Sequence, residues 1–220
     1  MSKKGPDITK DCVVPVFENK YLNVADIQYA EGRHYFDASR HAPRDIVAVK
    51  SDDEFKAMLP DAVTCFVIVK TPAEEPRLLF VREFRYPLGR FVIAPPAGLM
   101  DPEDRDSADP LFKTAIREIR EETGIEIRET DRLTVVNPLV FSSPGMTDES
   151  NALVGAVISL DDLTPLTDAN AEITECFDGF VLLTRDEALN MLKAGRDGED
   201  KFYSAYTWMA LMYFVSGIWE

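Results

Sequence analysis

A single helix with well-marked ends is the feature that most constrains how this chain folds. Asp109 and Pro110 are typical of a helix start, with an acid at the N-cap and proline in the first turn. Gly124 fits the left-handed position just beyond a helix end, and Ile125 can fold back onto the last turn. The sequence therefore predicts a rigid helix that runs to Thr123.

Two neighbouring sides of this helix carry different side chains. At about 100° per residue, an apolar stripe that we expect to pack is formed by Phe112, Ala115, Ile116 and Ile119. Beside it lies an arc of carboxylates, which we expect to project into solvent, from Glu118, Glu121 and Glu122. Ion pairs with Arg117 and Arg120 are the ordinary explanation of such charge. Carboxylates gathered on one face also suit Mg²⁺ or Mn²⁺, which prefer oxygen ligands.

Composition limits the classes of protein to which this helix can belong. A chain of 220 residues, 45% of them hydrophobic, can bury a sizeable core as one large domain or as a domain with a smaller extension. The net charge of −15 argues against nucleic-acid binding, because phosphate contacts need a basic face. An anionic substrate would have to be attracted by metal ions and local arginines.

Cysteine and histidine usage excludes further classes of site. The three cysteines, Cys12, Cys65 and Cys176, lie too far apart to indicate a disulfide framework or a zinc site. His34 and His41 are the only histidines, so a histidine-based triad is poorly supported. The basic first residues lead into no apolar segment, so we expect no secretion signal and a cytoplasmic protein.

The N-terminal part, residues 1–60, is predicted to be a small antiparallel β extension. Short strands are expected at residues 12–17, 21–24, 35–36 and 46–49, followed by a short helix at residues 52–59 that Pro60 ends. Tyr35 and Phe36 are interpreted as core residues rather than as rings that stack on a nucleobase. Such a unit buries little by itself, which favours packing on the main domain or on a partner subunit.

The remaining part, residues 61–220, is predicted to be an α/β domain with a mixed sheet. Residues 62–70 are nearly all apolar, as in a strand covered on both faces. Further strands are expected at residues 77–85, 91–94, 133–141, 152–160 and 180–183, whereas residues 99–108 are interpreted as a loop. Thr184 and Glu187 form a capping box for a helix through Lys193. The apolar segment 202–215 is too short to span a membrane, so we expect a buried or interface helix.

The segment Pro96-Ala97-Gly98, followed by Arg117-Glu118-Ile119-Arg120-Glu121-Glu122-Thr123-Gly124-Ile125, resembles the Nudix box. That pattern reads Gly, five residues, Glu, seven residues, then Arg-Glu-aliphatic-x-Glu-Glu-x-Gly-aliphatic. The right half matches at every fixed position. In the left half the spacing is five residues longer, and Asp109 stands at the first Glu when counted back from Arg117. The resemblance implies a Nudix α/β/α sandwich.

A wider resemblance points to the ADP-ribose pyrophosphatase-like branch of the Nudix hydrolases. It is carried by Arg82 to Arg90 before the box and by Ser143 to Glu149 after it. This resemblance implies that Arg85 binds a substrate phosphate and that the N-terminal strands form a homodimer. It also implies Mg²⁺, with Mn²⁺ as a substitute, held by the Ala97 carbonyl, Glu118, Glu121 and Glu122.

The same resemblance implies hydrolysis of a nucleoside diphosphate sugar, with neither a nucleic acid nor a membrane as partner. ADP-ribose, split into AMP and ribose 5-phosphate, is the leading substrate, and UDP- or GDP-sugars are close alternatives. The candidate catalytic residues are Glu121 and, as the base from a loop beyond the box, Glu175, with Glu172 and Glu149 behind it. The competing hypothesis is a non-catalytic, nucleotide-sensing regulator, which the lengthened loop and Asp109 favour.

Overall fold

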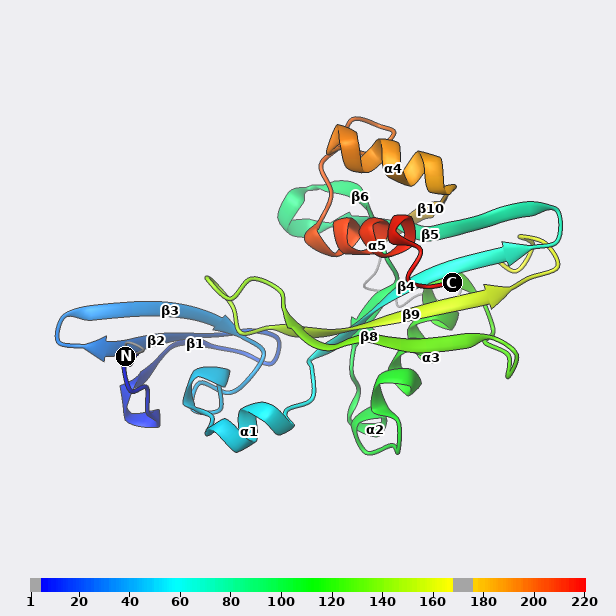
Figure 1. Cartoon of the computed structure of the whole chain (residues 1–220). Coiled ribbons are helices and arrows are strands. Elements are labelled where there is room, and N and C mark those ends of the chain that lie inside the picture. Colours follow the sequence, from blue (N-terminus) through cyan, green and yellow to red (C-terminus); the bar gives the residue numbers. More distant parts are fainter. Residues whose placement is uncertain (1–4, 168–175) are drawn as a thin grey trace. The chain divides into compact units, whose positions relative to one another are not determined.

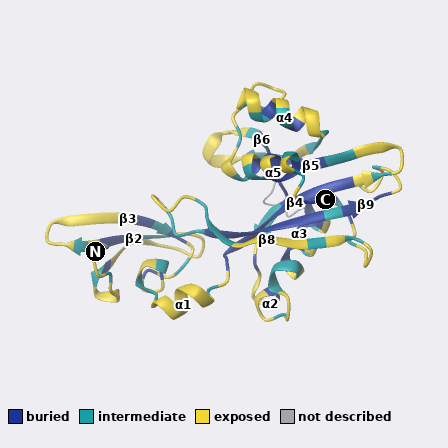
Figure 2. Cartoon of the chain, viewed as in Figure 1, coloured by how far each residue is buried: buried dark blue, intermediate teal, exposed yellow. Residues whose placement is uncertain are grey.

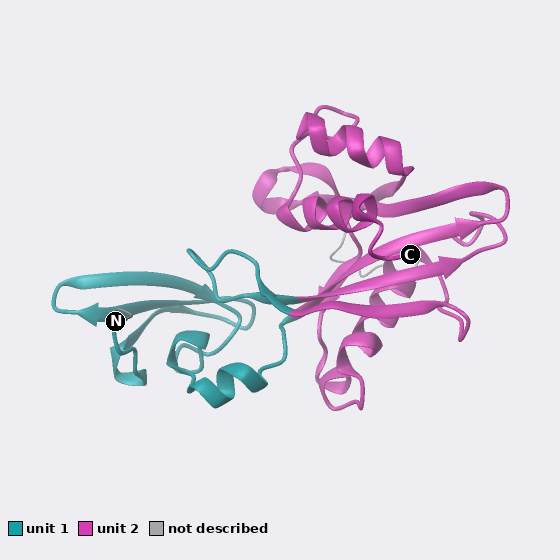
Figure 3. Ribbon diagram, viewed as in Figure 1, with its two compact units in different colours: residues 1–61, 139–151 teal, residues 62–138, 152–220 magenta. Residues whose placement is uncertain are grey.

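The structure, a computed structural model, describes residues 5–167 and 176–220. The chain divides into two compact units, which Figure 3 distinguishes by colour. Unit 1 comprises residues 1–61 and 139–151, and unit 2 comprises residues 62–138 and 152–220. Two strands, β8 (Arg132–Phe141) and β9 (Ser150–Ser159), contribute residues to both units.

Unit 1 is built on an antiparallel sheet with the strand order β1-β2-β3 (Figure 1). The strands are β1 (Val13–Glu18), β2 (Asn23–Ala30) and β3 (Arg33–Ser39). One face of this sheet is buried through Val13, Ala25 and Ile27, which pack with Ile46. The unit also contains the 3₁₀ helices η1 (Lys10–Cys12) and η2 (Val47–Val49) and the helix α1 (Asp52–Ala57), which opens with a Ser51–Glu54 capping box.

Two predictions for unit 1 are wrong. Residues 46–49 do not form a strand, because Val47–Val49 close a 3₁₀ turn in which the Val49 N–H bonds to the Ile46 carbonyl. Tyr35 and Phe36 are not core residues, since they are 47% and 58% exposed. Consecutive strand residues point to opposite faces, so a sheet buried on one face cannot cover both.

In the described part of unit 2, seven strands form one mixed sheet, with the order β10-β5-β4-β9-β8. In addition, β6 pairs with β5, and β7 pairs with β4. The bounds are β4 (Ala62–Thr71), β5 (Glu74–Arg85), β6 (Arg90–Ala94), β7 (Ala97–Leu99) and β10 (Phe177–Leu183). As predicted, β4 is central and buried along nearly its whole length (Figure 2).

Helices cover both faces of this sheet, which confirms the expected α/β/α sandwich. One face packs on α3 (Pro110–Thr123), where Ala115 and Ile119 join Cys65 and Val67 of β4 in one core. The opposite face packs on α5 (Ala205–Ser216), where the Tyr213 ring lies 5.5 Å from that of Phe66. Figure 1 shows the two helices on opposite sides of β4.

The remaining helices complete unit 2. The helix α4 (Arg185–Ala194) has the predicted Thr184–Glu187 capping box and ends at Gly195 in the left-handed conformation. Residues 99–108, interpreted from the sequence as a loop, include the end of β7 and a helical turn, α2 (Pro102–Arg105). Within the described ranges, no helix is both long and apolar enough to cross a membrane.

Candidate active site

The site is built on α3, whose ends lie where the sequence predicts them. The helix begins at Pro110, although the Asp109 side chain makes no capping hydrogen bond. Gly124 has a φ of 74°, and its N–H donates to the Arg120 carbonyl at 2.9 Å. Ile125 is fully buried behind this turn. These local signals fix the length of the helix but not the face that it buries.

The buried face of α3 differs from the predicted one. Ala115 and Ile119 are buried as expected, but Ile116 is 39% exposed. Glu118 and Glu122, predicted to project into solvent, are only 5% and 2% exposed. The helix is rotated so that its glutamates face β7 and β4, and part of the apolar stripe faces outward. Burying two carboxylates is costly unless charges or hydrogen bonds compensate.

Strand β7 supplies the room and one of the compensating hydrogen bonds. A Cβ atom at Gly98 would lie 2.0 Å from Glu118 Oε1, so only glycine permits this close approach. The Ala97 N–H donates to Glu122 Oε1 at 3.2 Å. The Pro96 carbonyl accepts from the Cys65 N–H at 2.7 Å, which ties the Pro-Ala-Gly segment to β4. The Pro96 carbonyl and the Ala97 N–H of this segment are therefore already hydrogen-bonded.

Arg117 connects the glutamates to the segment after β7. Its guanidinium donates to Glu118 Oε1 at 2.7 Å, to Glu121 Oε2 at 3.0 Å and to the Leu99 carbonyl at 2.8 Å. Burial opposes the positive charge, but Glu118, Asp104 and Glu121 outweigh it and raise the pKa of Arg117 above its usual value. Arg117 therefore stays charged and holds two of the three glutamates in place.

Asp104 of α2 is the other main partner of Arg117. Its Oδ2 accepts from Arg117 Nε at 3.1 Å, from Arg117 Nη2 at 3.0 Å and from Thr114 Oγ1 at 3.1 Å. Although burial works against ionisation, the hydrogen bonds and charge of Arg117 lower the pKa of Asp104. Asp104 thus holds the arginine. It has the role in the box pattern that counting back from Arg117 assigned to Asp109. Counting forward from Gly98 finds it, because five residues separate Gly98 from Asp104.

The structure brings together most of the residues proposed as metal ligands. Glu118 lies against Gly98, and Glu122 accepts a hydrogen bond from the Ala97 N–H. Glu121 lies one turn along α3 and pairs with Arg117 at 3.0 Å and with Arg120 at 3.8 Å. Burial, with the charges of Glu122 and Glu118, raises the pKa of the Cys65 thiol. Negative charge is therefore concentrated where β4, β7 and α3 meet.

The other predicted site residues have separate partners or are not described. Arg85 ends β5, and its Nη2 lies 2.7 Å from Glu83 Oε2. Glu149 belongs to unit 1 and accepts from Arg40 Nε at 2.7 Å. Glu172 and Glu175, the candidate bases, lie outside the described residues.

The donor set suits a divalent cation such as Mg²⁺ or Mn²⁺. In residues 5–167 and 176–220, no three His, Cys, Asp or Glu side chains form a ready metal-binding group. The available donors are nevertheless of the right type, because carboxylate and backbone carbonyl oxygens are the ligands that these hard cations prefer. Glu118 and Glu122 are one helical turn apart, and Gly98 places no side chain against Glu118.

Comparisons with known proteins agree with this arrangement. The sequence profile of the NUDIX domain family matches residues 58–206. ADP-ribose pyrophosphatase of Bacillus subtilis is 26% identical over 147 residues, which cover 67% of this chain and 70% of that protein. Methanol dehydrogenase activator of Bacillus methanolicus is 30% identical over 154 residues, 70% of this chain and 71% of that protein.

A solved structure supports the same fold. The crystal structure of ADP compounds hydrolase superposes with a TM-score of 0.61 and 17% identity, covering 98% of this chain and 95% of that one. In two further curated relatives the match spans less than half of the relative's own length, 46% and 44%. The profile match covers more than half of the chain, including α3 and β7, and the chain therefore belongs to the NUDIX domain family.

Proposed function

We propose that this chain hydrolyses the diphosphate bond of a nucleoside diphosphate sugar with the help of Mg²⁺, which Mn²⁺ can replace. The observation that carries the proposal is the burial of Glu118 against Gly98 and of Glu122 beside the Ala97 N–H, an arrangement that costs stability and needs a functional reason. ADP-ribose is the proposed substrate, with AMP and ribose 5-phosphate as products. The names of two similar proteins, ADP-ribose pyrophosphatase and ADP compounds hydrolase, support this choice over UDP- and GDP-sugars.

In this proposal the cation is held by Glu118, Glu121, Glu122 and the Ala97 carbonyl. When bound, a divalent cation supplies positive charge against the diphosphate and makes water a better nucleophile. The Ala97 N–H fixes one oxygen of Glu122, and Arg117 orients Glu118 and Glu121. The cytoplasm is the proposed location of the reaction.

We also assign residues to substrate binding and to proton transfer. Arg85 binds a phosphate in exchange for its present partner Glu83, since a guanidinium forms charge-assisted, often bidentate hydrogen bonds with phosphates as well as with carboxylates. Glu175 takes up the proton of the attacking water, with Glu172 and Glu149 as the alternatives, and Glu121 is the other proposed catalytic residue.

The test is a panel of ADP-ribose, UDP-sugars and GDP-sugars incubated with Mg²⁺ or Mn²⁺, with detection of the nucleoside monophosphate. We expect AMP from ADP-ribose, and we expect Glu118→Gln and Glu122→Gln each to lower the rate by about 100-fold or more, because a neutral amide holds a cation poorly. Glu126→Gln, just beyond the helix and exposed, is the matched control. Unchanged turnover in either of the first two variants would remove the metal-site assignment.

A regulatory function is the second candidate. Methanol dehydrogenase activator is named for its effect on an enzyme, and Arg117 already neutralises part of the charge on Glu118 and Glu121. A regulator would bind a nucleotide in calorimetry and release no nucleoside monophosphate from any compound in the panel. Release of AMP at a rate that depends on Glu118 would exclude this non-catalytic alternative.

We further propose that residues 1–60 form a β extension through which two copies of the chain form a homodimer. On the face of the unit 1 sheet away from Val13 and Ile27, Val14 and Phe36 lie on either side of Asp26 in register, and both apolar side chains are exposed. Phe17, paired with Val24, lies on the same face and is also exposed. Exposed apolar side chains gathered on one face often mark an interaction site. Light scattering should give the mass of a dimer, and a monomer at micromolar concentration would contradict the proposal.

A further inference from the structure

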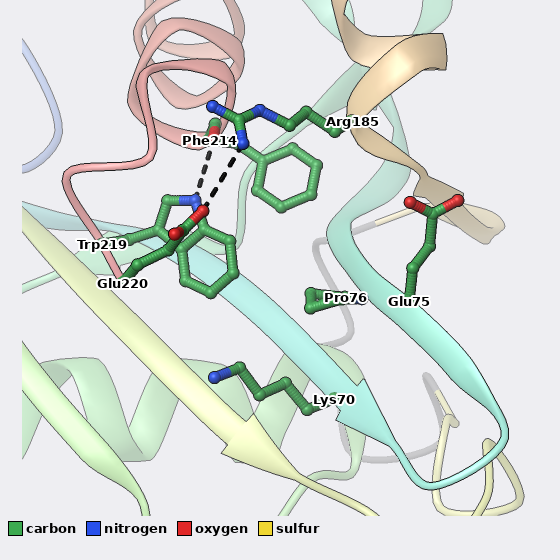
Figure 4. A pocket seen from close by; sticks show the side chains of 7 residues that line it. All are labelled: Lys70, Glu75, Pro76, Arg185, Phe214, Trp219 and Glu220. Atoms are coloured by element: carbon green, nitrogen blue, oxygen red, sulfur yellow. Dashed lines mark hydrogen bonds and ion pairs between the residues drawn. The ribbon is translucent and has the colours of Figure 1, made fainter.

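Unit 2 contains a hollow that is lined by residues other than the glutamates of α3. Its volume is about 450 Å³, and it is bordered by the β4–β5 hairpin, the first residue of α4 and the segment from the end of α5 onward (Figure 4). This volume is within the range of small-molecule sites, about 300–1,000 Å³. The nature of its walls indicates what kind of molecule it accepts.

One wall is apolar, planar and rigid. Phe214 and Trp219 are both buried, and their rings stack with centroids 5.6 Å apart and an interplanar angle of 28°. The indole N–H of Trp219 donates to the Phe214 carbonyl at 2.8 Å, which fixes the edge of the ring. Pro76 adds a further apolar surface. An aromatic ring fits such a wall, because offset ring stacking adds to the effect of burial.

The charged side chains around the hollow differ in whether they already have hydrogen-bond or ion-pair partners. Arg185 donates to the Val215 carbonyl from Nε at 3.1 Å and from Nη2 at 2.7 Å, and its Nη1 lies 3.5 Å from Glu220 Oε1. These contacts make Arg185 a structural member of the wall. The Lys70 ammonium lies 5.3 Å from the centre of the Trp219 ring. In the described part of the chain, no carboxylate lies within ion-pair distance of Lys70.

We propose that this hollow binds a small aromatic carboxylate. The ring of the ligand packs against the wall formed by Trp219, Phe214 and Pro76, and its carboxylate pairs with the Lys70 ammonium, which lies over the Trp219 ring. Glu75 and Glu220 also border the hollow, and their negative charge disfavours ligands with several charges, including a diphosphate. The site is therefore distinct in chemistry from the proposed nucleotide site, and its occupancy does not depend on the proposed hydrolysis.

Two classes of compound carry both an aromatic ring and a carboxylate, namely simple aromatic acids and aromatic amino acids. Glu75 distinguishes them, because its carboxylate repels a simple acid but attracts the ammonium group of an amino acid. Glu75→Gln should therefore tighten binding of the first and weaken binding of the second.

The test uses fluorine NMR of 4-fluorophenylacetate added to the whole chain without a divalent cation. We expect saturable binding with a Kd of about 0.1–1 mM. Lys70→Gln should weaken it by about 10-fold, as expected for the loss of a charged partner. Lys70→Arg should retain it, and Lys193→Gln, an exposed lysine of α4 with the same change of charge, is the matched control.

Two further probes complete the experiment. 4-Fluorophenylalanine reports the amino-acid alternative, in the wild type and in Glu75→Gln. 4-Fluorophenylethanol lacks the carboxylate and should bind at least about 5-fold more weakly than the acid. Equal binding of the acid and the alcohol, equal loss in Lys70→Gln and Lys193→Gln, or no saturable binding of either carboxylate would overturn the proposal. Glu118→Gln should bind the probe normally, which separates this result from any failure of the proposed hydrolysis.

Discussion

Two buried aspartates, Asp104 of unit 2 and Asp37 of unit 1, have opposite electrostatic environments. They are almost equally inaccessible, with 3% and 8% of their surfaces exposed. Asp104 faces the Arg117 guanidinium, which lowers the pKa of its carboxyl despite burial. Burial and the neighbouring charge of Asp148 raise the pKa of Asp37 to about 6. Burial alone therefore does not decide whether an acid stays ionised, since the nearest charge does.

The same contrast separates the functions that the two regions can support. Around α3, hydrogen bonds from Arg117 and from the Ala97 N–H compensate the carboxylates of Glu118, Glu122 and Asp104. Around β3, His41 lowers the pKa of Asp37, but by less than the charge of Asp148 raises it. The first arrangement suits a cation site, and the second reduces stability at neutral pH.

The largest expected effect comes from Gly98→Ala. The added methyl group would meet Glu118 Oε1 at 2.0 Å, so the carboxylate or β7 must move. Because the proposed cation depends on Glu118, we expect hydrolysis of ADP-ribose to fall by about 100-fold or more. Gly198→Ala is the control, since nothing lies within 4 Å of the added Cβ and its φ is not positive. Normal activity in Gly98→Ala would show that Glu118 is not held at this position.

A smaller effect, on stability, is expected from Asp104→Asn. This change leaves Arg117 buried with less negative charge around it, and breaking such a pair costs about 3 kcal/mol. Asp109→Asn should change stability by less than about 0.5 kcal/mol, because Asp109 makes no capping hydrogen bond. Urea unfolding measures both variants. Equal effects would mean that the pairing with Asp104 does not hold Arg117.

Asp104 also shows which parts of the site can be predicted from the sequence. The ends of α3 depend on proline and glycine within one turn, so local signals suffice for them. The choice between Asp104 and Asp109 depends on where the additional five residues lie, because counting forward from Gly98 selects Asp104 and counting back from Arg117 selects Asp109. Only the contact with Arg117 decides it. The burial of Glu118 and Glu122 similarly depends on β7, which lies about 20 residues earlier in the chain.

The strands also show what sequence patterns can and cannot predict. The central strand β4 was predictable because a continuous apolar run has one main explanation, a strand covered on both faces. The exposure of Tyr35 and Phe36 was not, because aromatic residues favour strands without indicating which face is covered. Sequence patterns thus locate the elements of this fold better than they assign the faces of those elements.

The smallest expected effect concerns Asp37 and the pH dependence of stability. An acid whose pKa is higher in the folded state than in the unfolded state, here about 6 against 3.8, stabilises the fold at low pH. This contribution is complete below pH 3.8 and is lost as the pH rises through about 6. Asp37→Asn removes the titrating group and keeps an oxygen that accepts the hydrogen bond from the Asp148 backbone.

Unfolding of the wild type and Asp37→Asn should therefore be compared at pH 4.5 and pH 7.5. We expect the variant to gain about 1 kcal/mol relative to the wild type between these two values, a reduced figure because part of the charge is screened. Asp45→Asn, an exposed aspartate of the same unit, is the control and should show no such gain. Parallel pH profiles for Asp37→Asn and the wild type would mean that Asp37 titrates normally. Asp148 would then not raise the pKa of Asp37, and the contrast between Asp37 and Asp104 would fail.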